Sequence, residues 1–108
     1  MGHGLGAAEM GVLEVSVAEA GAVAPARVRV RDAQGVDRVP AGAVVVPIGP
    51  DKWFACMGRA RLDVAVGQVS IRIERGTEYR PIIETVQVAG GQTVRRQIEL
   101  HRWIDMKA

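Results

Sequence analysis

Cysteine is almost absent from the sequence, which contains one residue of this type, Cys56, among 108 residues. A single thiol cannot form a disulfide within the chain. Its neighbours Phe54, Ala55 and Met57 predict a buried, unreactive thiol, because a nucleophilic cysteine needs a nearby base and access to substrate. The chain must therefore fold without a covalent cross-link of its own.

Histidine and serine, which often carry acid–base and nucleophilic chemistry, are also scarce. The two histidines, His3 and His101, stand far apart, and His101 has only Asp105 four residues later as a possible second ligand. A catalytic zinc ion needs three convergent protein ligands. The two serines, Ser16 and Ser70, lack the glycine-flanked turn of a hydrolase nucleophile. We therefore expect no catalytic site, no metal and no cofactor in this chain.

Long apolar runs and clustered basic runs are missing as well. No segment approaches the roughly 20 apolar residues of a membrane span. The first residues, 1–10, lack the basic-then-apolar order of a signal peptide and are interpreted as a flexible leader. The 14 basic residues are interspersed with 12 acidic ones, and aromatics make up 4% of the chain. This pattern favours neither a membrane nor a nucleic acid as partner.

The sequence is rich in valine, much of it at alternating positions. Apolar residues recur at every second position, the period of a strand with one buried face. The 13 glycines and 5 prolines stand largely between these segments, where they favour turns. The alternating or apolar segments are 13–17, 28–30, 43–48, 53–56, 62–66, 69–73, 82–88 and 94–100. They predict an all-β, immunoglobulin-like sandwich of about seven antiparallel strands over residues 11–106.

Two pairs of neighbouring strands are predicted to form hairpins. Gly67-Gln68 separates segments 62–66 and 69–73, and Gly90-Gly91 separates 82–88 and 94–100. Short glycine-containing loops between alternating segments are typical of hairpins.

A row of three arginines, Arg27, Arg29 and Arg31, alternates with valines on one predicted strand. Such a row is interpreted first as a solvated face whose charges pair with Asp or Glu on neighbouring strands. The alternative is a platform for an anion or an acidic sugar.

Trp53 and Phe54 are adjacent and follow the apolar segment 44–48. Exposed aromatic side chains on a sandwich can anchor a partner protein or stack on sugar rings. The alternative is that both rings fill the core at one end of the sandwich. Trp53 and Phe54 are therefore candidates for an interaction surface.

Parts of the chain resemble a known accessory domain. The matching segments are Ala60–Gly67, Ile71–Pro81 and Ile98–Met106, of which the Glu-Arg-Gly-Thr-Glu-Tyr and Arg-Trp-Ile-Asp runs are the most specific. They resemble the prealbumin-like, or carboxypeptidase-regulatory-like, sandwich found ahead of some bacterial metal-dependent hydrolases. These enzymes belong to the PHP (polymerase and histidinol phosphatase) superfamily, in the branch similar to carbaryl hydrolase. The resemblance extends over about residues 11–106.

The resemblance implies a non-catalytic accessory domain that packs on, or spaces, a carboxyl-terminal hydrolase domain of the same exported protein. Trp103 and Ile104 would then belong to the contact surface with that domain. Gly76, Tyr79 and Pro81 are expected to shape a structural loop, with the Tyr79 ring inward and its hydroxyl on a backbone carbonyl. The alternative function is a carbohydrate- or other ligand-binding module. In isolation, exposed strand edges could also pair two copies of the chain.

Overall fold

The computed structural model describes residues 9–102, except for the side chains of Pro47 and Ile48. Ten strands run through this part of the chain: β1 (Met10–Glu19), β2 (Ala22–Val23), β3 (Ala26–Arg31), β4 (Asp37–Arg38), β5 (Val45–Ile48), β6 (Asp51–Cys56), β7 (Arg59–Ala65), β8 (Gly67–Glu74), β9 (Ile82–Val88) and β10 (Thr93–Glu99). None of the described residues forms a helix long and apolar enough to cross a membrane. Trp103 and Ile104 lie outside the described residues.

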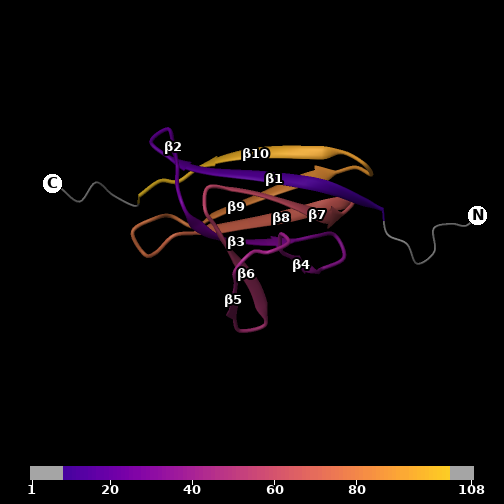
Figure 1. Cartoon of the computed structure of the whole chain (residues 1–108), viewed down its shortest axis with the longest axis horizontal. Helices are drawn as coiled ribbons and strands as arrows, with labels where there is room; N and C mark the ends of the chain where they lie inside the picture. The colour runs from indigo at the N-terminus through magenta and orange to yellow at the C-terminus, as the bar shows by residue number, and fades with distance from the viewer. Residues whose placement is uncertain (1–8, 103–108) are drawn as a thin grey trace, which may run out of the picture.

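The strands form two packed sheets. In the β1 sheet, β1 pairs with β10, β7 and β2, and in the β3 sheet the order is β5-β6-β3-β8-β9, with β4 beside β3. Figure 1 shows β1 and β10 along one side of the molecule, β3 and β8 beneath them, and the β5–β6 hairpin projecting away. The predicted all-β sandwich is confirmed.

Alternation along each strand places the core between the sheets. On β1, Leu13 and Val17 are fully buried, and on β8, Val69 and Ile71 are fully buried. Burial of one such side chain contributes about 1.5–3 kcal/mol relative to its exposure. The same two-residue period that predicted the strands therefore also defines the core.

Neither predicted hairpin is formed, because both connections cross between the sheets. β7 pairs with β1, whereas β8 pairs with β3 and β9. Gly67 makes the first crossing possible, since its φ of 120° suits glycine, and a Cβ there would approach the Ala33 Cβ to 2.7 Å. At the second crossing, β9 stays in the β3 sheet while β10 joins the β1 sheet. Alternation alone cannot distinguish a hairpin from a crossing, because both keep the same face inward.

β10 pairs with β1 in parallel, with Leu13 opposite Val94 and Val17 opposite Ile98. The other strand pairs of the described residues are antiparallel, as the sequence predicts. The parallel pair joins the first and the last strand. The chain therefore enters the sandwich near Met10 at one end and leaves β10 at the opposite end (Figure 1).

A buried carboxylate, that of Asp32, joins the two sheets. It follows β3 and receives hydrogen bonds from the backbone N–H groups of Gln34 and Val36 in its own turn. Its second oxygen accepts from Arg38 Nε at 2.6 Å and from the Ala65 N–H of β7 at 3.0 Å. One side chain thus closes the turn after β3 and ties it to the β1 sheet.

Candidate functional site

A cluster of charged residues around Glu19 holds the last described residues against the sandwich. The Tyr79 hydroxyl donates to Glu19 Oε1 at 2.9 Å, and Arg102 Nε donates to Glu19 Oε2 at 3.2 Å. Arg102 also donates to Glu78, and Arg75 lies 3.7 Å from Glu19. We call these five residues the Glu19 clamp. It joins the end of β1, the loop before β9 and the segment after β10.

Backbone bonds reinforce the clamp. Tyr79 and Arg102 form an antiparallel bridge, and the Arg80 N–H donates to the His101 carbonyl at 2.9 Å. On the other side, the Leu100 N–H donates to the Ala18 carbonyl at 2.8 Å. The segment that leaves β10 is therefore bound on both of its edges.

The Tyr79 ring is the apolar part of this cluster. The ring is buried, and the guanidinium carbons of Arg75 and Arg102 are 5.2 and 5.1 Å from its centroid. Cations at this distance are attracted to the face of an aromatic ring. The inward ring agrees with the prediction for this loop, but the hydroxyl bonds to Glu19 rather than to a backbone carbonyl. Gly76 lies in the same loop with φ 64°, and Pro81 directly precedes β9.

The electrostatics of the clamp favour its charged form. The hydrogen bond from Tyr79, followed by that from Arg102, holds the pKa of Glu19 below its ordinary value. The hydrogen bond to Glu19 in turn raises the pKa of Arg102. A carboxylate with a lowered pKa in the folded state stabilises it above the unfolded pKa, and this stabilisation is lost as the pH falls through the folded pKa. The clamp is therefore intact at neutral pH and loosens in acid.

We expect Glu19→Gln to loosen the segment after β10 without unfolding the sandwich. Loss of the charge removes both charge-assisted bonds, so exchange of the Arg80 and Leu100 amide protons should accelerate roughly three- to tenfold. Native-state hydrogen exchange by NMR measures this directly. The matched control is Glu14→Gln, because Glu14 also lies on β1 and also binds two arginines, Arg61 and Arg95. Equal acceleration in both variants would contradict a local clamp.

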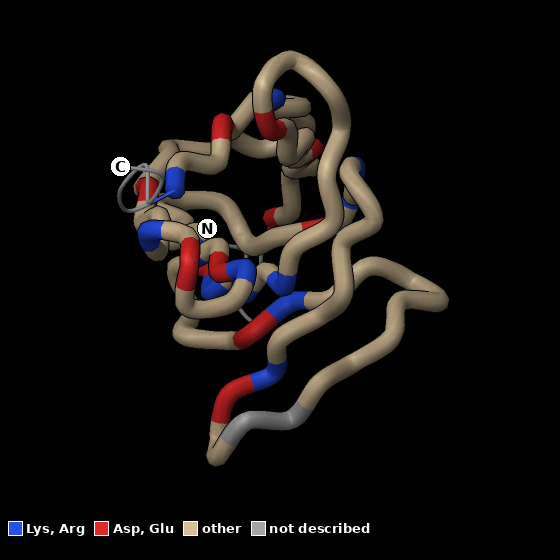
Figure 2. Tube along the Cα trace, turned by 90° about the vertical axis from the view of Figure 1, so that its left-hand side faces the viewer, with Lys and Arg blue, Asp and Glu red and all other residues tan. Residues whose placement is uncertain are grey.

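The arginine row of β3 is a network of ion pairs. Arg27 pairs with Glu74, Arg29 with Asp51, and Arg31 with both Asp37 and Asp51. Figure 2 shows basic and acidic positions side by side along the chain rather than gathered by sign. The first interpretation of this row, a face paired with acidic neighbours, is confirmed.

Trp53 and Phe54 do not form an exposed aromatic surface, which corrects that hypothesis. Phe54 is fully buried between the sheets, opposite Val28. Trp53 points the other way but is only 5% exposed, because the guanidinium groups of Arg27 and Arg29 lie 5.6 and 5.9 Å from its ring centroid. Its indole N–H has no hydrogen-bond partner among the described residues. Both aromatic residues are structural.

The remaining candidates for chemistry are dispersed. The Cys56 thiol is buried, and burial raises its pKa, in agreement with the predicted unreactive thiol. Residues 9–102 contain no group of three or more His, Cys, Asp or Glu side chains that could hold a metal ion. His101 is exposed beside the clamp.

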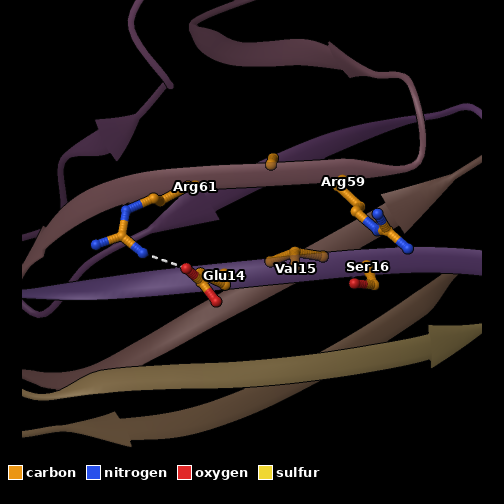
Figure 3. A pocket seen from close by; sticks show the side chains of 6 residues that line it. Glu14, Val15, Ser16, Arg59 and Arg61 are labelled. Atoms are coloured by element: carbon orange, nitrogen blue, oxygen red, sulfur yellow. Dashed lines mark hydrogen bonds and ion pairs between the residues drawn. The ribbon is translucent and has the colours of Figure 1, made fainter.

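A shallow hollow of about 330 Å³ opens on the outer face of the β1 sheet. Figure 3 shows its residues, with Arg59 and Arg61 on β7 facing Ser16 and Glu14 on β1. Hydrogen bonding to Arg95, and to a smaller extent to Arg61, lowers the pKa of Glu14. The hollow thus contains one carboxylate already neutralised by arginines, which gives it no pair of free acid and base groups.

Sequence reasoning identified Tyr79 but missed its partners. Glu19 and Arg102 are 83 residues apart, so no local spacing could connect them. Only the parallel pairing of β1 with β10 brings the two segments together. One local feature did mark Glu19: it is a charged residue at the next inward position of the alternating strand that contains Leu13 and Val17.

Comparison with known proteins supports the fold and leaves the family open. No protein-family model matches the sequence, and no curated protein is significantly similar to it. A solved structure, described as the Bacillus anthracis TIE protein, is similar with a TM-score of 0.56 and 13% identity, covering 86% of this chain. The chain corresponds to 16% of the length of that protein. At this identity the likeness establishes the fold alone: the chain has a β-rich fold that also occurs within a much longer protein.

Proposed function

We propose that the chain is a non-catalytic accessory domain that fixes the direction in which its polypeptide continues beyond β10. The observation that carries this proposal is the Glu19 clamp, which binds the segment 100–102 through side chains and backbone. A flexible tether would need none of these bonds. A clamped exit is useful where a neighbouring domain must be held at a defined position.

The finer proposal is that the neighbour is a metal-dependent hydrolase domain, with this chain a prealbumin-like domain ahead of it. The sequence resemblance over 11–106 supports it, as do the two specific runs 74–79 and 102–105, which contain Tyr79 and Arg102 of the clamp, respectively. In this proposal the accessory domain supplies contact and position, and the hydrolase domain supplies the metal ligands. Export of the whole protein belongs to the same proposal.

The test uses the longest natural polypeptide that contains this sequence. We expect it to continue into a domain with metal-binding histidines and to hydrolyse a substrate in a metal-dependent way. Deletion of residues 9–102 should lower the melting temperature or activity of the remaining domain. Small-angle scattering should show a broader distribution of domain positions in Glu19→Gln than in the control Glu14→Gln. The proposal would be contradicted if the longer chain contained no metal-binding hydrolase domain. It would also be contradicted if the deletion changed neither melting temperature nor activity.

The carbohydrate-binding alternative has lost the feature on which it was based. Stacking on a sugar ring requires an exposed aromatic face, and the described aromatic residues Trp53, Phe54 and Tyr79 are buried. No aromatic side chain among residues 9–102 therefore supports carbohydrate binding.

A further inference from the structure

One edge of β7 offers unused backbone hydrogen-bonding groups. The Val66 N–H donates to the Glu9 carbonyl, and the Val17 N–H donates to the Gly58 carbonyl. The backbone N–H and C=O groups of the even-numbered residues of β7 therefore point toward β1. In an antiparallel pair, the residues between them direct their N–H and C=O groups to the opposite edge. The backbone groups of Arg59, Arg61 and Asp63 therefore point away from β1, where no other described strand pairs with β7.

This edge is closed at one end and open at the other. Near the end of the strand, the outward N–H of Ala65 is bonded to Asp32. Beside the first residues of the strand, by contrast, lies a hollow of about 440 Å³. Its lining is mostly apolar and comes from β7, β6 and the segment before β5: Pro40, Ala41, Gly42, Ala43, Val44, Phe54, Ala55, Met57, Arg59, Ala60 and Arg61. An extended backbone could therefore reach Arg59 and Arg61.

The mouth of the hollow exposes apolar side chains. Met57 is 75% exposed and Val44 is 68% exposed, and both line it. Large apolar side chains gathered at one edge of a monomer mark interaction sites more often than scattered ones do. The hollow is therefore suited to an apolar side chain of a partner.

The charge is positive at the start of this edge, at Arg59 and Arg61, whereas Asp63 adds an exposed carboxylate further along β7. Arg59 has no ion-pair partner among the described residues, and the Arg61 side chain, 62% exposed, shares Glu14 with Arg95. Figure 3 shows the side chains of Arg59 and Arg61 over the outer face of the β1 sheet. Successive side chains of a strand point to opposite faces. A strand added here would thus set alternate side chains beside these arginines and the others toward the hollow.

We propose that the β7 edge from Arg59 to Asp63 binds an extended partner segment in which acidic and apolar side chains alternate. Its backbone would bond to the outward N–H and C=O groups of Arg59 and Arg61, as in strand addition to a sheet edge. Its carboxylates would lie beside the two arginines, and an apolar side chain would enter the hollow next to Met57. The site is separate from the Glu19 clamp, and this inference does not depend on the proposed function.

The test titrates the isotope-labelled chain with an acetylated and amidated peptide, Glu-Val-Glu-Val-Glu-Val-Glu, monitored by NMR. We expect the amide signals of Arg59, Arg61 and Asp63 to shift in a saturable way. A peptide with lysine in place of glutamate should bind at least about tenfold more weakly, because like charges are brought together. Arg59→Glu should weaken binding of the acidic peptide by a similar factor.

The matched control is Arg96→Glu, which makes the same charge change on β10, where Arg96 pairs with Glu84 and with no residue of the β7 edge, and should alter binding less than about twofold. Arg61→Pro removes one outward N–H without removing a bond to β1 and should also weaken binding. If that variant does not fold, Arg59→Glu with its control decides the question. Shifts confined to β5, β9 or β10, or equal binding of the lysine peptide, would overturn the proposal. So would shifts of the β7 amides with protein concentration alone, which would identify a second copy as the occupant.

Discussion

Replacement of Asp32 by alanine is expected to cost about 3–5 kcal/mol of the free energy of unfolding, because four donors lose a charged acceptor and each buried donor left without a partner costs about 1–3 kcal/mol. The carboxylate accepts three backbone N–H bonds and one from Arg38, and its side chain is fully buried. Alanine would leave all four donors without this acceptor, and one of them, the Ala65 N–H, belongs to the other sheet. The loss should therefore destabilise the contact between the sheets as well as the turn.

Urea unfolding followed by Trp fluorescence would measure this change. Arg38→Ala is the comparison variant, because it removes one donor and keeps the carboxylate with its three backbone partners. We expect it to cost less than half as much as Asp32→Ala. If the two variants were equally unstable, the ion pair with Arg38 rather than the backbone bonds would carry the stabilisation by Asp32.

The effect of Asp32 should also depend on pH. Burial alone raises the pKa of this carboxyl, but the hydrogen bonds from Ala65, Arg38 and the turn amides outweigh it, so the pKa lies below its ordinary value. Stabilisation by such a group is complete above the unfolded pKa, about 3.9, and is lost as the pH falls through the folded pKa. The difference in unfolding free energy between wild type and Asp32→Asn should thus be constant at neutral pH and shrink in strong acid.

Phe54→Ala is the second substitution with a large expected effect, again about 3–5 kcal/mol. Phe54 is the largest fully buried side chain of the described core, and its removal leaves a cavity that the rigid strands around it cannot fill. Phe54→Leu should cost less, because it retains most of the volume. The control is Met57→Ala, close in sequence but 75% exposed, which should change stability by no more than about 0.5 kcal/mol. A small loss in Phe54→Ala would restore the hypothesis of an exposed aromatic surface.

The local parts of this fold could be predicted from the sequence, and the pairing of its strands could not. Alternation identified the strands around Leu13, Val28 and Ile71 because inward and outward positions differ in polarity. The same alternation does not indicate which of the two sheets a strand joins. Gly67 illustrates the difficulty, because a glycine between two alternating strands predicts a hairpin turn. In the structure, its positive φ allows the chain to cross from one sheet to the other.

The candidate sites show the same division. Tyr79 was recognised because an aromatic residue in a glycine- and proline-bounded loop is locally conspicuous. Its partners Glu19 and Arg102 come from the end of the first strand and from the segment after the last one. The outward backbone groups of Arg59 and Arg61 depend on the register of β7 with β1. Interactions of this kind are a property of tertiary pairing and leave no local pattern.

The parallel pairing of β1 with β10 has a mechanical consequence. A pull on the two ends of the described chain would draw β1 and β10 past each other lengthwise, because one strand is the first and the other the last. Their evenly spaced hydrogen bonds, with Val12 to Ala18 opposite Thr93 to Glu99, would then carry the force together in shear instead of opening one after another. A domain built in this way resists stretching along its polypeptide far better than a terminal hairpin would.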